Sequence, residues 1–280
     1  MTFDPRMTPA RRDLAAVHLK GEIEAPRYAE GREMHVAVPV LPMTSHPDPE
    51  AGFSSQLLMG ERFTVYDVDD ATGLAWGQAA RDGYVGWVPR FALESGPGAP
   101  THWVVAQLAH IYPEPNLKTR PFDAVPFLAQ LRITGQEGRW LELDTGGWIY
   151  GRHVSEERPG GDWVGICERF LGVPYLWGGK SSLGLDCSAL IQSGLHGAGL
   201  DCPRDSDQQE EALGRELKLD AKLKRGDIVF WNGHVGVMTS PKRLFHANAF
   251  AMAAVYEDIE LARDRIDAQG DGPVTRIRRL

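Results

Sequence analysis

Several broad classes of protein are excluded by what this sequence lacks. It has three cysteines, Cys167, Cys187 and Cys202, with no CxxC pair among them, which argues against both a disulfide framework and a zinc ribbon. No cluster of ligands has the spacing of a metal site and no glycine-rich phosphate loop is present, so we expect no metal and no organic cofactor. One of the cysteines is therefore a candidate nucleophile.

Membrane spans and nucleic-acid partners are not expected either. No window approaches the roughly 18 consecutive apolar residues of a membrane helix. The net charge is −8, and no run of Lys and Arg exceeds a few residues, so the basic surface that nucleic acids require is missing. The N-terminus has neither the apolar stretch nor the small-residue cleavage site of a signal peptide. We therefore expect a cytoplasmic protein.

What remains is an ordinary globular composition, with 42% hydrophobic and 24% charged residues. A chain of 280 residues is long enough for one large domain or for two to three small ones. The residue pattern changes along the chain. It predicts an N-terminal arm at 1–32, two small β-barrels at 33–97 and 98–157, and a final domain at 158–280. We expect the arm to be helical or a simple lead-in to the first barrel.

The two central segments are expected to be copies of one module. Gly86-Trp87-Val88 in the first is matched by Gly147-Trp148-Ile149 in the second, each with an aliphatic residue six positions after the tryptophan. We expect both tryptophans to belong to the module cores. Pro97, Gly98 and Pro100 mark the linker between the copies. The first copy contains the strand-like runs 34–40, 63–68 and 84–88.

The last segment predicts helices followed by antiparallel strands, which is an α+β arrangement. Apolar residues fall at helical spacing from Trp163 to Leu171 and again from Cys187 to Ala198. Five strand-like runs follow, at 227–231, 234–238, 244–247, 252–256 and 274–277.

Cys187 is the candidate nucleophile of this segment. The stretch PYLWGGKSSLGLDCSALIQ, residues 174–192, leads through Asp186 into Cys187 at the start of a predicted helix. Helix N-termini present free N–H groups and a positive potential, which lower the pKa of a cysteine and can bind an oxyanion. Taken alone, Cys187 could equally be a buried structural thiol, which is what we expect of Cys167 and Cys202.

A thiolate nucleophile needs an imidazole to carry protons, and that imidazole needs a polar partner. His234 and His246 lie 12 residues apart on two strands that a turn at 240–243 would pair, so the rings can be cross-strand or diagonal neighbours. They share a face only if the connecting loop has odd length or contains a bulge. His234 is then the general base and His246 the orienting group, a task that the nearby Asn248 could also perform.

These residues closely resemble the NlpC/p60 family of papain-like cysteine peptidases. The matching parts occur in order, as PYLWGG and DCSALIQ, RDSDQQ at 204–209, GDIVFW at 226–231, GHVGVM at 233–238 and LFHAN at 244–248. The visible departure is Ala189, where the family usually has glycine, and we expect no loss of activity from it. The paired modules resemble the bacterial SH3-like domains that precede this domain in the γ-D-glutamyl-L-diamino acid endopeptidases. The resemblance thus implies a papain-like α+β domain after two SH3-like β-barrels.

The resemblance also implies a function. It implies hydrolysis of the bond between D-glutamate and the diamino acid in short murein peptides with a free N-terminal L-Ala, as in cell-wall peptide recycling. Cys187 would be the nucleophile, His234 the base and His246 the orienting residue, with Tyr175 near the oxyanion. The substrate-binding residues that it implies are Trp177 in the wall, Asp186 at the substrate ammonium, and Asp205 and Ser206 at the D-glutamate. Ser188 is a further substrate-binding residue, and Glu61 or Tyr84 of the first β-barrel would be additional ammonium ligands.

Other interpretations stay open at this point. Asp186 and Asp205 can simply cap helices. The chain could be a non-catalytic peptidoglycan-binding protein, although an intact Cys/His/His set and the missing export signal oppose this. It could also be a thiol acyltransferase, in which an amine rather than water resolves the acyl-enzyme.

Overall fold

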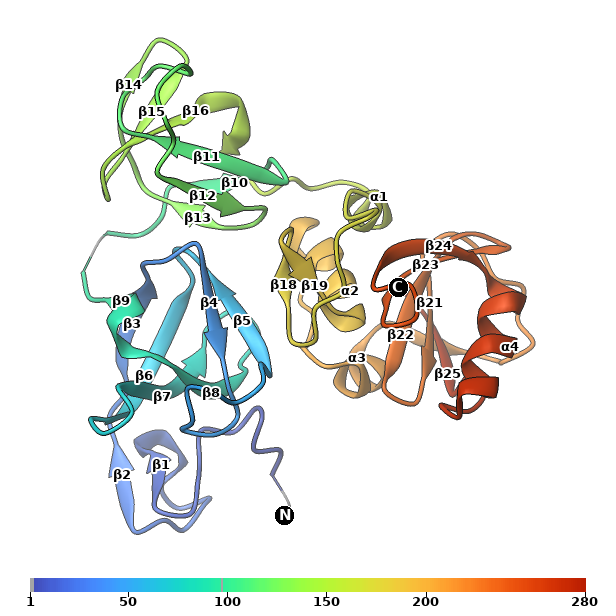
Figure 1. The fold of residues 1–280 in the computed structure, drawn as a ribbon. Coiled ribbons are helices and arrows are strands. Elements are labelled where there is room, and N and C mark those ends of the chain that lie inside the picture. The colour runs from blue at the N-terminus through green and yellow to red at the C-terminus, as the bar shows by residue number, and fades with distance from the viewer. Residues whose placement is uncertain (1–2, 97) are drawn as a thin grey trace. The chain divides into compact units, whose positions relative to one another are not determined.

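The computed structural model describes residues 3–96 and 98–280 (Figure 1). The chain divides into two compact units, one ending at Glu157 and the other running from Arg158 to Leu280. Among the described residues, no helix is both long enough and apolar enough to cross a membrane. Pro97, expected in the linker, lies outside the described residues.

The N-terminal segment contains short strands, so the expectation of a helical arm was wrong. Its elements are β1 (Leu14–Ala16), the 3-10 turn η1 (Val17–Leu19) and β2 (Arg27–Ala29), with β1 and β2 paired in parallel. Leu14 is 1% exposed and packs with Trp76 and Trp87, and the Arg11 guanidinium lies 4.9 Å from both tryptophan rings. All three residues of β1 are buried, which an amphipathic helix with one buried stripe would not achieve.

The first β module combines a five-stranded antiparallel sheet in the order β8-β7-β6-β3-β9 with the hairpin β4-β5. Its elements are β3 (Arg32–Val36), β4 (Val40–Met43), β5 (Ser55–Leu58), β6 (Arg62–Asp69), β7 (Leu74–Ala79), β8 (Val85–Pro89), η2 (Arg90–Ala92) and β9 (Leu93–Glu94). The three apolar runs of the sequence lie largely in strands, and Met34, Phe63 and Val88 form part of the core. Trp87 is buried, as expected of a core residue.

The second β module has a five-stranded sheet in the order β12-β11-β16-β15-β14 and a three-stranded sheet in the order β13-β10-β17. Its elements are β10 (His102–Val104), β11 (Leu108–Tyr112), β12 (Asp123–Pro126), β13 (Gln130–Leu131), β14 (Ile133–Glu137), β15 (Trp140–Leu143), β16 (Trp148–Tyr150), η3 (Gly151–His153) and β17 (Val154–Ser155). Ile111, Val125 and Ile149 are buried in it. Trp148 is only partly buried, because it lies on the other face of β16 from Ile149.

The second unit has the α+β architecture expected from its pattern. The helices precede or flank a six-stranded sheet in the order β20-β25-β21-β22-β23-β24. Its elements are α1 (Trp163–Glu168), β18 (Lys180–Ser181), β19 (Gly184–Leu185), α2 (Cys187–Gly197), α3 (Ser206–Ala212), β20 (Arg215–Leu217), β21 (Asp227–Trp231), β22 (His234–Ser240), β23 (Arg243–Asn248), β24 (Ala253–Asp258), α4 (Ile259–Gln269) and β25 (Arg276–Arg279). The five strand-like runs of the sequence correspond to β21 to β25.

Candidate active site

Cys187 is the first residue of α2, as the sequence predicts. The short hairpin β18-β19 leads into the helix, and Asp186 is the N-cap, whose carboxylate accepts a hydrogen bond of 2.8 Å from the Ala189 amide. Every residue of α2 is buried, so the helix is fixed in the interior of the unit. The cysteine side chain is 7% exposed.

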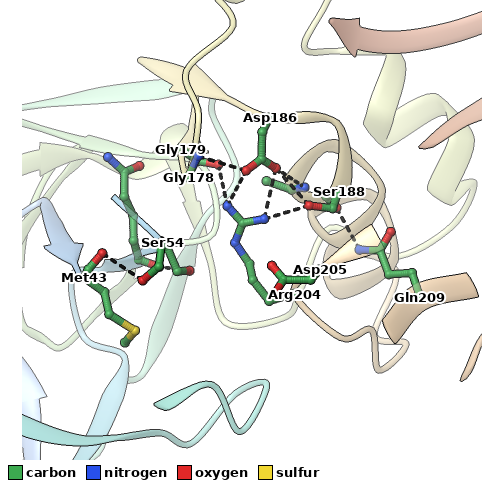
Figure 2. Close-up of polar contacts among 12 residues, drawn as sticks. Met43, Ser54, Gly178, Gly179, Asp186, Ser188, Arg204, Asp205 and Gln209 are labelled. Atoms are coloured by element: carbon green, nitrogen blue, oxygen red, sulfur yellow. Dashed lines mark hydrogen bonds and ion pairs between the residues drawn. The ribbon is translucent and has the colours of Figure 1, made fainter. Parts of the chain in front are cut away.

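Arg204 is a partner of Asp186 that the sequence interpretation missed (Figure 2). Its guanidinium, 1% exposed, donates to both oxygens of the Asp186 carboxylate at 3.0 and 2.7 Å. It also donates to the Ser188 hydroxyl at 2.8 Å and to the Gly179 carbonyl at 3.2 Å. This forked geometry suits an arginine and not a lysine. Arg204 belongs to the RDSDQQ stretch that carries part of the family resemblance. Nothing in the sequence, however, indicates that its side chain contacts Asp186.

The surroundings of Asp186 bear on the ammonium-binding role expected for it. Besides Arg204, its carboxylate accepts hydrogen bonds from the Gly178 amide and the Ser188 hydroxyl, both at 3.0 Å. A carboxylate offers about four lone-pair sites, and these are already occupied, with the charge matched by Arg204. The geometry therefore makes Asp186 the cap of α2 and half of a buried ion pair, and its contact with a substrate ammonium stays a prediction.

The surroundings of Cys187 oppose the lowered thiol pKa that its position at a helix start predicts. Burial, and then the negative charge of Asp186, raise the pKa of the Cys187 thiol to about 12, while the backbone amides of Val235 and Ser188 act in the opposite direction. The helix N-terminus alone would lower that pKa, but desolvation disfavours the thiolate more strongly. Burial therefore favours the neutral thiol of Cys187 over the thiolate that the helix start predicts.

The two histidines meet on neighbouring strands. β21 and β22 are joined by the two-residue turn Asn232-Gly233, in which Gly233 has φ of 72°, and this turn pairs Trp231 with His234. The ladder between β22 and β23 contains a bulge between Met238 and Ser240, which is one of the two conditions predicted for the rings to share a face. His234 Nε2 lies 2.9 Å from His246 Nδ1.

Gly236 leaves room for this pair. A Cβ at this position would lie 3.1 Å from the His246 Cβ and 2.8 Å from the Leu244 Cδ1. Its neighbour Val235 approaches the Cys187 sulfur through its backbone amide. The start of β22 therefore brings together His234, the space for His246 and a contact with Cys187.

Glu257 and Arg265 extend the chain of hydrogen bonds beyond His246. His246 is fully buried, and its Nε2 lies 3.0 Å from Glu257 Oε2 on β24. Arg265 of α4 donates to both carboxylate oxygens of Glu257, at 2.9 and 2.7 Å. The Arg265 hydrogen bonds, and then that of His246, lower the pKa of Glu257 to about 2. Neither residue was predicted, because their contact depends on the register of β24 and on α4.

The carboxylate of Glu257 determines the tautomers of both imidazoles. His246 Nε2 also lies 2.9 Å from Asn248 Nδ2, whose amide orientation is fixed because Asn248 Oδ1 accepts from the Ala251 amide. A charge-assisted hydrogen bond is about twice as strong as a neutral one, so His246 Nε2 carries the proton and donates to Glu257. His246 Nδ1 then accepts from His234 Nε2, which leaves Nδ1 of His234 as the basic nitrogen.

Burial favours the neutral form of both imidazoles. Desolvation, followed by the proximity of His246, lowers the pKa of His234 to about 3. Desolvation also lowers the pKa of His246, against the opposing effect of Glu257. Burial thus favours the uncharged forms of Cys187, His234 and His246 alike.

Tyr175 and Trp177, both expected at the site, differ in their exposure to solvent. Tyr175 is partly buried and bridges to Leu185, and its backbone amide donates to the Met252 carbonyl at 2.9 Å. Burial, and then the proximity of Cys187 and Asp186, raise the pKa of Tyr175, which favours a neutral hydroxyl there. Trp177 is 71% exposed.

Ser188, Asp205 and Ser206 lie around the start of α2 and α3. Ser188 is 5% exposed, with its hydroxyl bonded to Asp186 and Arg204. Asp205 is the N-cap of α3 in a capping box with Gln208, and Ser206 is the first residue of that helix. Gln209 ties the two helices together by donating to the Ser188 carbonyl at 2.9 Å. The roles expected for these residues in substrate binding stay predictions.

Glu61 and Tyr84 are both buried within the first unit. Glu61 is 1% exposed and forms an ion pair of 2.8 Å with Arg81. Tyr84 belongs to the core of the first β module. Their role as ammonium ligands stays a prediction.

The remaining cysteines have structural settings. Cys167 is fully buried, donates from its sulfur to the Leu190 carbonyl at 3.3 Å and packs against Gly194. Burial raises its pKa. Cys202 is 4% exposed. All three cysteines are free, and within the described part of the chain no group of His, Cys, Asp and Glu could hold a metal ion.

A cysteine at a helix start, beside the strand that carries one of two paired histidines, is typical of a papain-like thiol peptidase domain. Residues 172–260 match the NlpC/P60 family, and residues 43–93 match the bacterial dipeptidyl-peptidase SH3 domain. The chain thus carries an NlpC/P60 cysteine peptidase domain preceded by an SH3 domain of the bacterial dipeptidyl-peptidase type.

Similar proteins agree with this assignment. A gamma-D-glutamyl-L-lysine dipeptidyl-peptidase of Bacillus cereus is 27% identical over 63% of this chain and 59% of its own length. The protein of the same name from Bacillus subtilis is 29% identical over 59% of this chain and 60% of its own length. The matches therefore span about three fifths of these relatives. A crystal structure of an NlpC/P60 family protein from Bacillus cereus has the same fold, with a TM-score of 0.72 at 18% identity over 89% of this chain and 99% of that one.

Proposed function

We propose that this chain is a cysteine peptidase that hydrolyses the bond between γ-D-glutamate and a diamino acid in short murein peptides. The observation that carries the proposal is that Cys187 starts a buried helix beside the strand of His234. The His234 imidazole is joined in series to His246 and Glu257. Together these residues supply a nucleophile, a base and a polar group that orients the base. The proposed setting is the cytoplasm, a reducing compartment in which a free thiol persists.

The first step is acylation. The Cys187 thiol transfers its proton to His234 Nδ1 as the sulfur attacks the γ-carbonyl carbon of the substrate. The N–H groups at the start of α2 and the neutral hydroxyl of Tyr175 stabilise the oxyanion. The positive charge that develops on His234 is stabilised through His246 by Glu257, which Arg265 keeps ionised. The imidazolium then protonates the leaving amine of the diamino acid, and the C–N bond breaks to leave a thioester.

The second step is hydrolysis. His234, neutral again, takes a proton from a water molecule that attacks the thioester carbon. The collapse of this intermediate breaks the C–S bond, and the proton on His234 returns to the Cys187 sulfur. Atoms and charges balance over the cycle, with one water consumed and no cofactor required.

The choice of substrate is supported by the relatives, whose names specify γ-D-glutamyl-L-lysine and the release of dipeptides. A peptidase that releases a dipeptide must recognise the free N-terminus of its substrate. A charge-assisted contact to that ammonium contributes roughly 1.5–3 kcal/mol, which corresponds to about tenfold or more in kcat/KM.

The proposal is tested with two peptides that differ in one group, L-Ala-γ-D-Glu-L-Lys with a free and with an acetylated N-terminus. We expect the free peptide to yield L-Ala-D-Glu and lysine, and acetylation to lower kcat/KM by at least about tenfold. A third peptide with an α-linked glutamate should not be cleaved. Equal rates on the free and acetylated peptides would refute the dipeptidyl specificity, and cleavage of the α-linked isomer would refute the γ-glutamyl specificity.

A further inference from the structure

The turn between β23 and β24 contains a residue in an unusual backbone conformation. The turn comprises residues 249–252, because Asn248 pairs with Ala253 across it. Its last residue, Met252, has φ of 50°, and among the described residues Leu128 is the only other non-glycine residue with a positive φ. The left-handed region is unfavourable for a residue with a Cβ and is normally occupied by glycine or asparagine. A methionine held there points to a function for this conformation.

The carbonyl of Met252 binds a segment that runs along the edge of the sheet. β24 is an outer strand of the six-stranded sheet. The Ala254 amide donates to the Val173 carbonyl and the Gly172 amide donates to the Ala254 carbonyl, both at 2.9 Å. The Tyr175 amide then donates to the Met252 carbonyl, also at 2.9 Å. Because the backbone angles of Met252 set the direction of its carbonyl, the contact with Tyr175 depends on the left-handed conformation.

The same segment leads on to Cys187. Tyr175 forms a parallel bridge with Leu185. The Leu185 amide donates to the Pro174 carbonyl, and the Leu176 amide donates to the Leu185 carbonyl, both at 3.1 Å. Leu185 lies two residues before Cys187, the first residue of α2. The segment is therefore bonded on one side to the edge of the sheet and on the other to the chain that enters α2.

The turn also contacts the hydrogen-bonded groups around His246. Asn248 Oδ1 accepts from the Ala251 amide at 2.7 Å, while Asn248 Nδ2 lies 2.9 Å from His246 Nε2. The Phe250 ring centroid lies 4.8 Å from the guanidinium of Arg265, at the far end of the same chain of hydrogen bonds. The turn thus joins the imidazole side of the site to the segment that enters α2.

We propose that Met252 is a positioning residue for the peptidase reaction, whose left-handed carbonyl fixes residues 174–176, and through them Cys187, relative to His246. The inference rests on the proposed function and adds a residue to it. The Met252 side chain is 60% exposed, so the backbone conformation matters more than the packing of the side chain. A small misplacement of reacting groups can cost about 100-fold in rate, so the effect should fall on kcat and not on KM.

The test replaces Met252 with residues that differ in their tolerance of the left-handed region. Glycine and asparagine adopt it readily, whereas the β-branched isoleucine is strongly disfavoured there. With L-Ala-γ-D-Glu-L-Lys and the full chain, we expect Met252→Gly and Met252→Asn to keep the wild-type kcat. Met252→Ile should lower kcat about tenfold or more with little change in KM. Leu219→Ile is the matched control, since Leu219 is 55% exposed in the same unit without a positive φ.

Hydrogen exchange of the Tyr175 amide, followed by NMR of the full chain, tests the same contact without turnover. We expect this amide to exchange at least about tenfold faster in Met252→Ile than in the wild type, Met252→Gly and Met252→Asn. The amides of β21 serve as the reference for global unfolding and should be unchanged.

Several results would overturn the inference. One is a wild-type kcat, or an unchanged exchange rate of the Tyr175 amide, in Met252→Ile. Equal losses of kcat in Met252→Gly and Met252→Ile would show that the side chain matters and not the backbone conformation. Faster exchange of the β21 amides as well would make Met252 a residue of general stability. An active wild type with any of these results refutes this inference alone, whereas a wild type without turnover refutes the proposed function.

Discussion

At the scale of single residues, the most informative pair is Cys187 and His234, because burial favours the neutral form of both side chains. The pKa of the thiol is raised to about 12 and that of the imidazole is lowered to about 3. We therefore expect no thiolate–imidazolium pair before substrate binds. We expect the proton to pass from Cys187 to His234 during the reaction itself, once the substrate carbonyl occupies the oxyanion site.

The first prediction concerns alkylation of Cys187 by iodoacetamide. Below its pKa the thiolate fraction rises tenfold per pH unit, so the alkylation rate should rise about tenfold per unit between pH 6 and 9 without a plateau. Intact-protein mass spectrometry with peptide mapping measures the rate, and Cys167 and Cys202 serve as internal controls that should react far more slowly. A plateau reached below pH 7 would instead reveal a stored ion pair.

The second prediction concerns the carboxylate that orients the imidazoles. Glu257→Gln removes the charge that fixes the His246 tautomer and stabilises the imidazolium, so kcat should fall by about tenfold or more with a smaller change in KM. A shift in the pH dependence of kcat should accompany the loss, which a purely structural role would not produce. The control is Glu260→Gln, an exposed carboxylate paired with Arg263. An unchanged kcat in Glu257→Gln would show that Glu257 neither orients His246 nor stabilises the imidazolium.

At this scale the sequence predicts the positions of Cys187 and His234 in the fold better than it predicts the residues that contact their surroundings. Cys187 follows from a glycine-rich loop before a helical pattern, and His234 from its turn and strand, both of which are local signals. Arg204 and Glu257 become recognisable only when a distant element reaches Asp186 or His246. The raised thiol pKa was also missed, because burial is a property of the folded unit and not of the helix start.

At the scale of elements, the contact between the His234 and His246 imidazoles depends on one turn and one bulge. The Asn-Gly turn sets the register of β21 and β22 and is visible in the sequence. The sequence does not show the bulge between Met238 and Ser240. It shows only that a bulge or a loop of odd length is needed, because side chains alternate along a strand and the two imidazoles would otherwise lie on opposite faces of the sheet. The N-terminal segment was predicted wrongly because its burial depends on the tryptophans of β7 and β8.

The third prediction concerns the space that Gly236 leaves. In Gly236→Ala the new Cβ would press on His246 and Leu244, and overpacking of this kind costs about 1–3 kcal/mol. We expect kcat to fall more than the stability change explains, since the His246 ring is displaced from His234. Thermal unfolding and turnover should be measured together, with Gly52→Ala as the control because a Cβ there meets nothing within 4 Å. Full activity in Gly236→Ala would show that the pair does not need this space.

At the scale of the whole molecule, the buried histidines tie the stability of the second unit to pH. His234 and His246 have lowered pKa values in the folded protein, so the unfolded chain binds more protons as the pH falls. Their contribution is fully present above the unfolded pKa of about 6.5 and is lost progressively below it. Glu257, with its pKa lowered to about 2, adds a further loss below about 4.5.

The fourth prediction follows from this linkage. The thermal transition of the second unit should move to lower temperature between pH 7 and pH 4, and the dependence should be shallower in His234→Gln. Calorimetry of the full chain measures both. A transition of the second unit that does not change from pH 7 to pH 4 would contradict the neutral state assigned to the two imidazoles.

The central claim is that the Cys187 thiol cleaves the γ-D-glutamyl bond. It is tested most directly by incubating L-Ala-γ-D-Glu-L-Lys with the wild-type chain, with Cys187→Ala and with Cys202→Ala, and by identifying the products by mass spectrometry. We predict L-Ala-D-Glu and free lysine from the wild type and Cys202→Ala, and intact tripeptide with Cys187→Ala at unchanged thermal stability. Intact tripeptide with the wild type, or product formed by Cys187→Ala, would contradict the account.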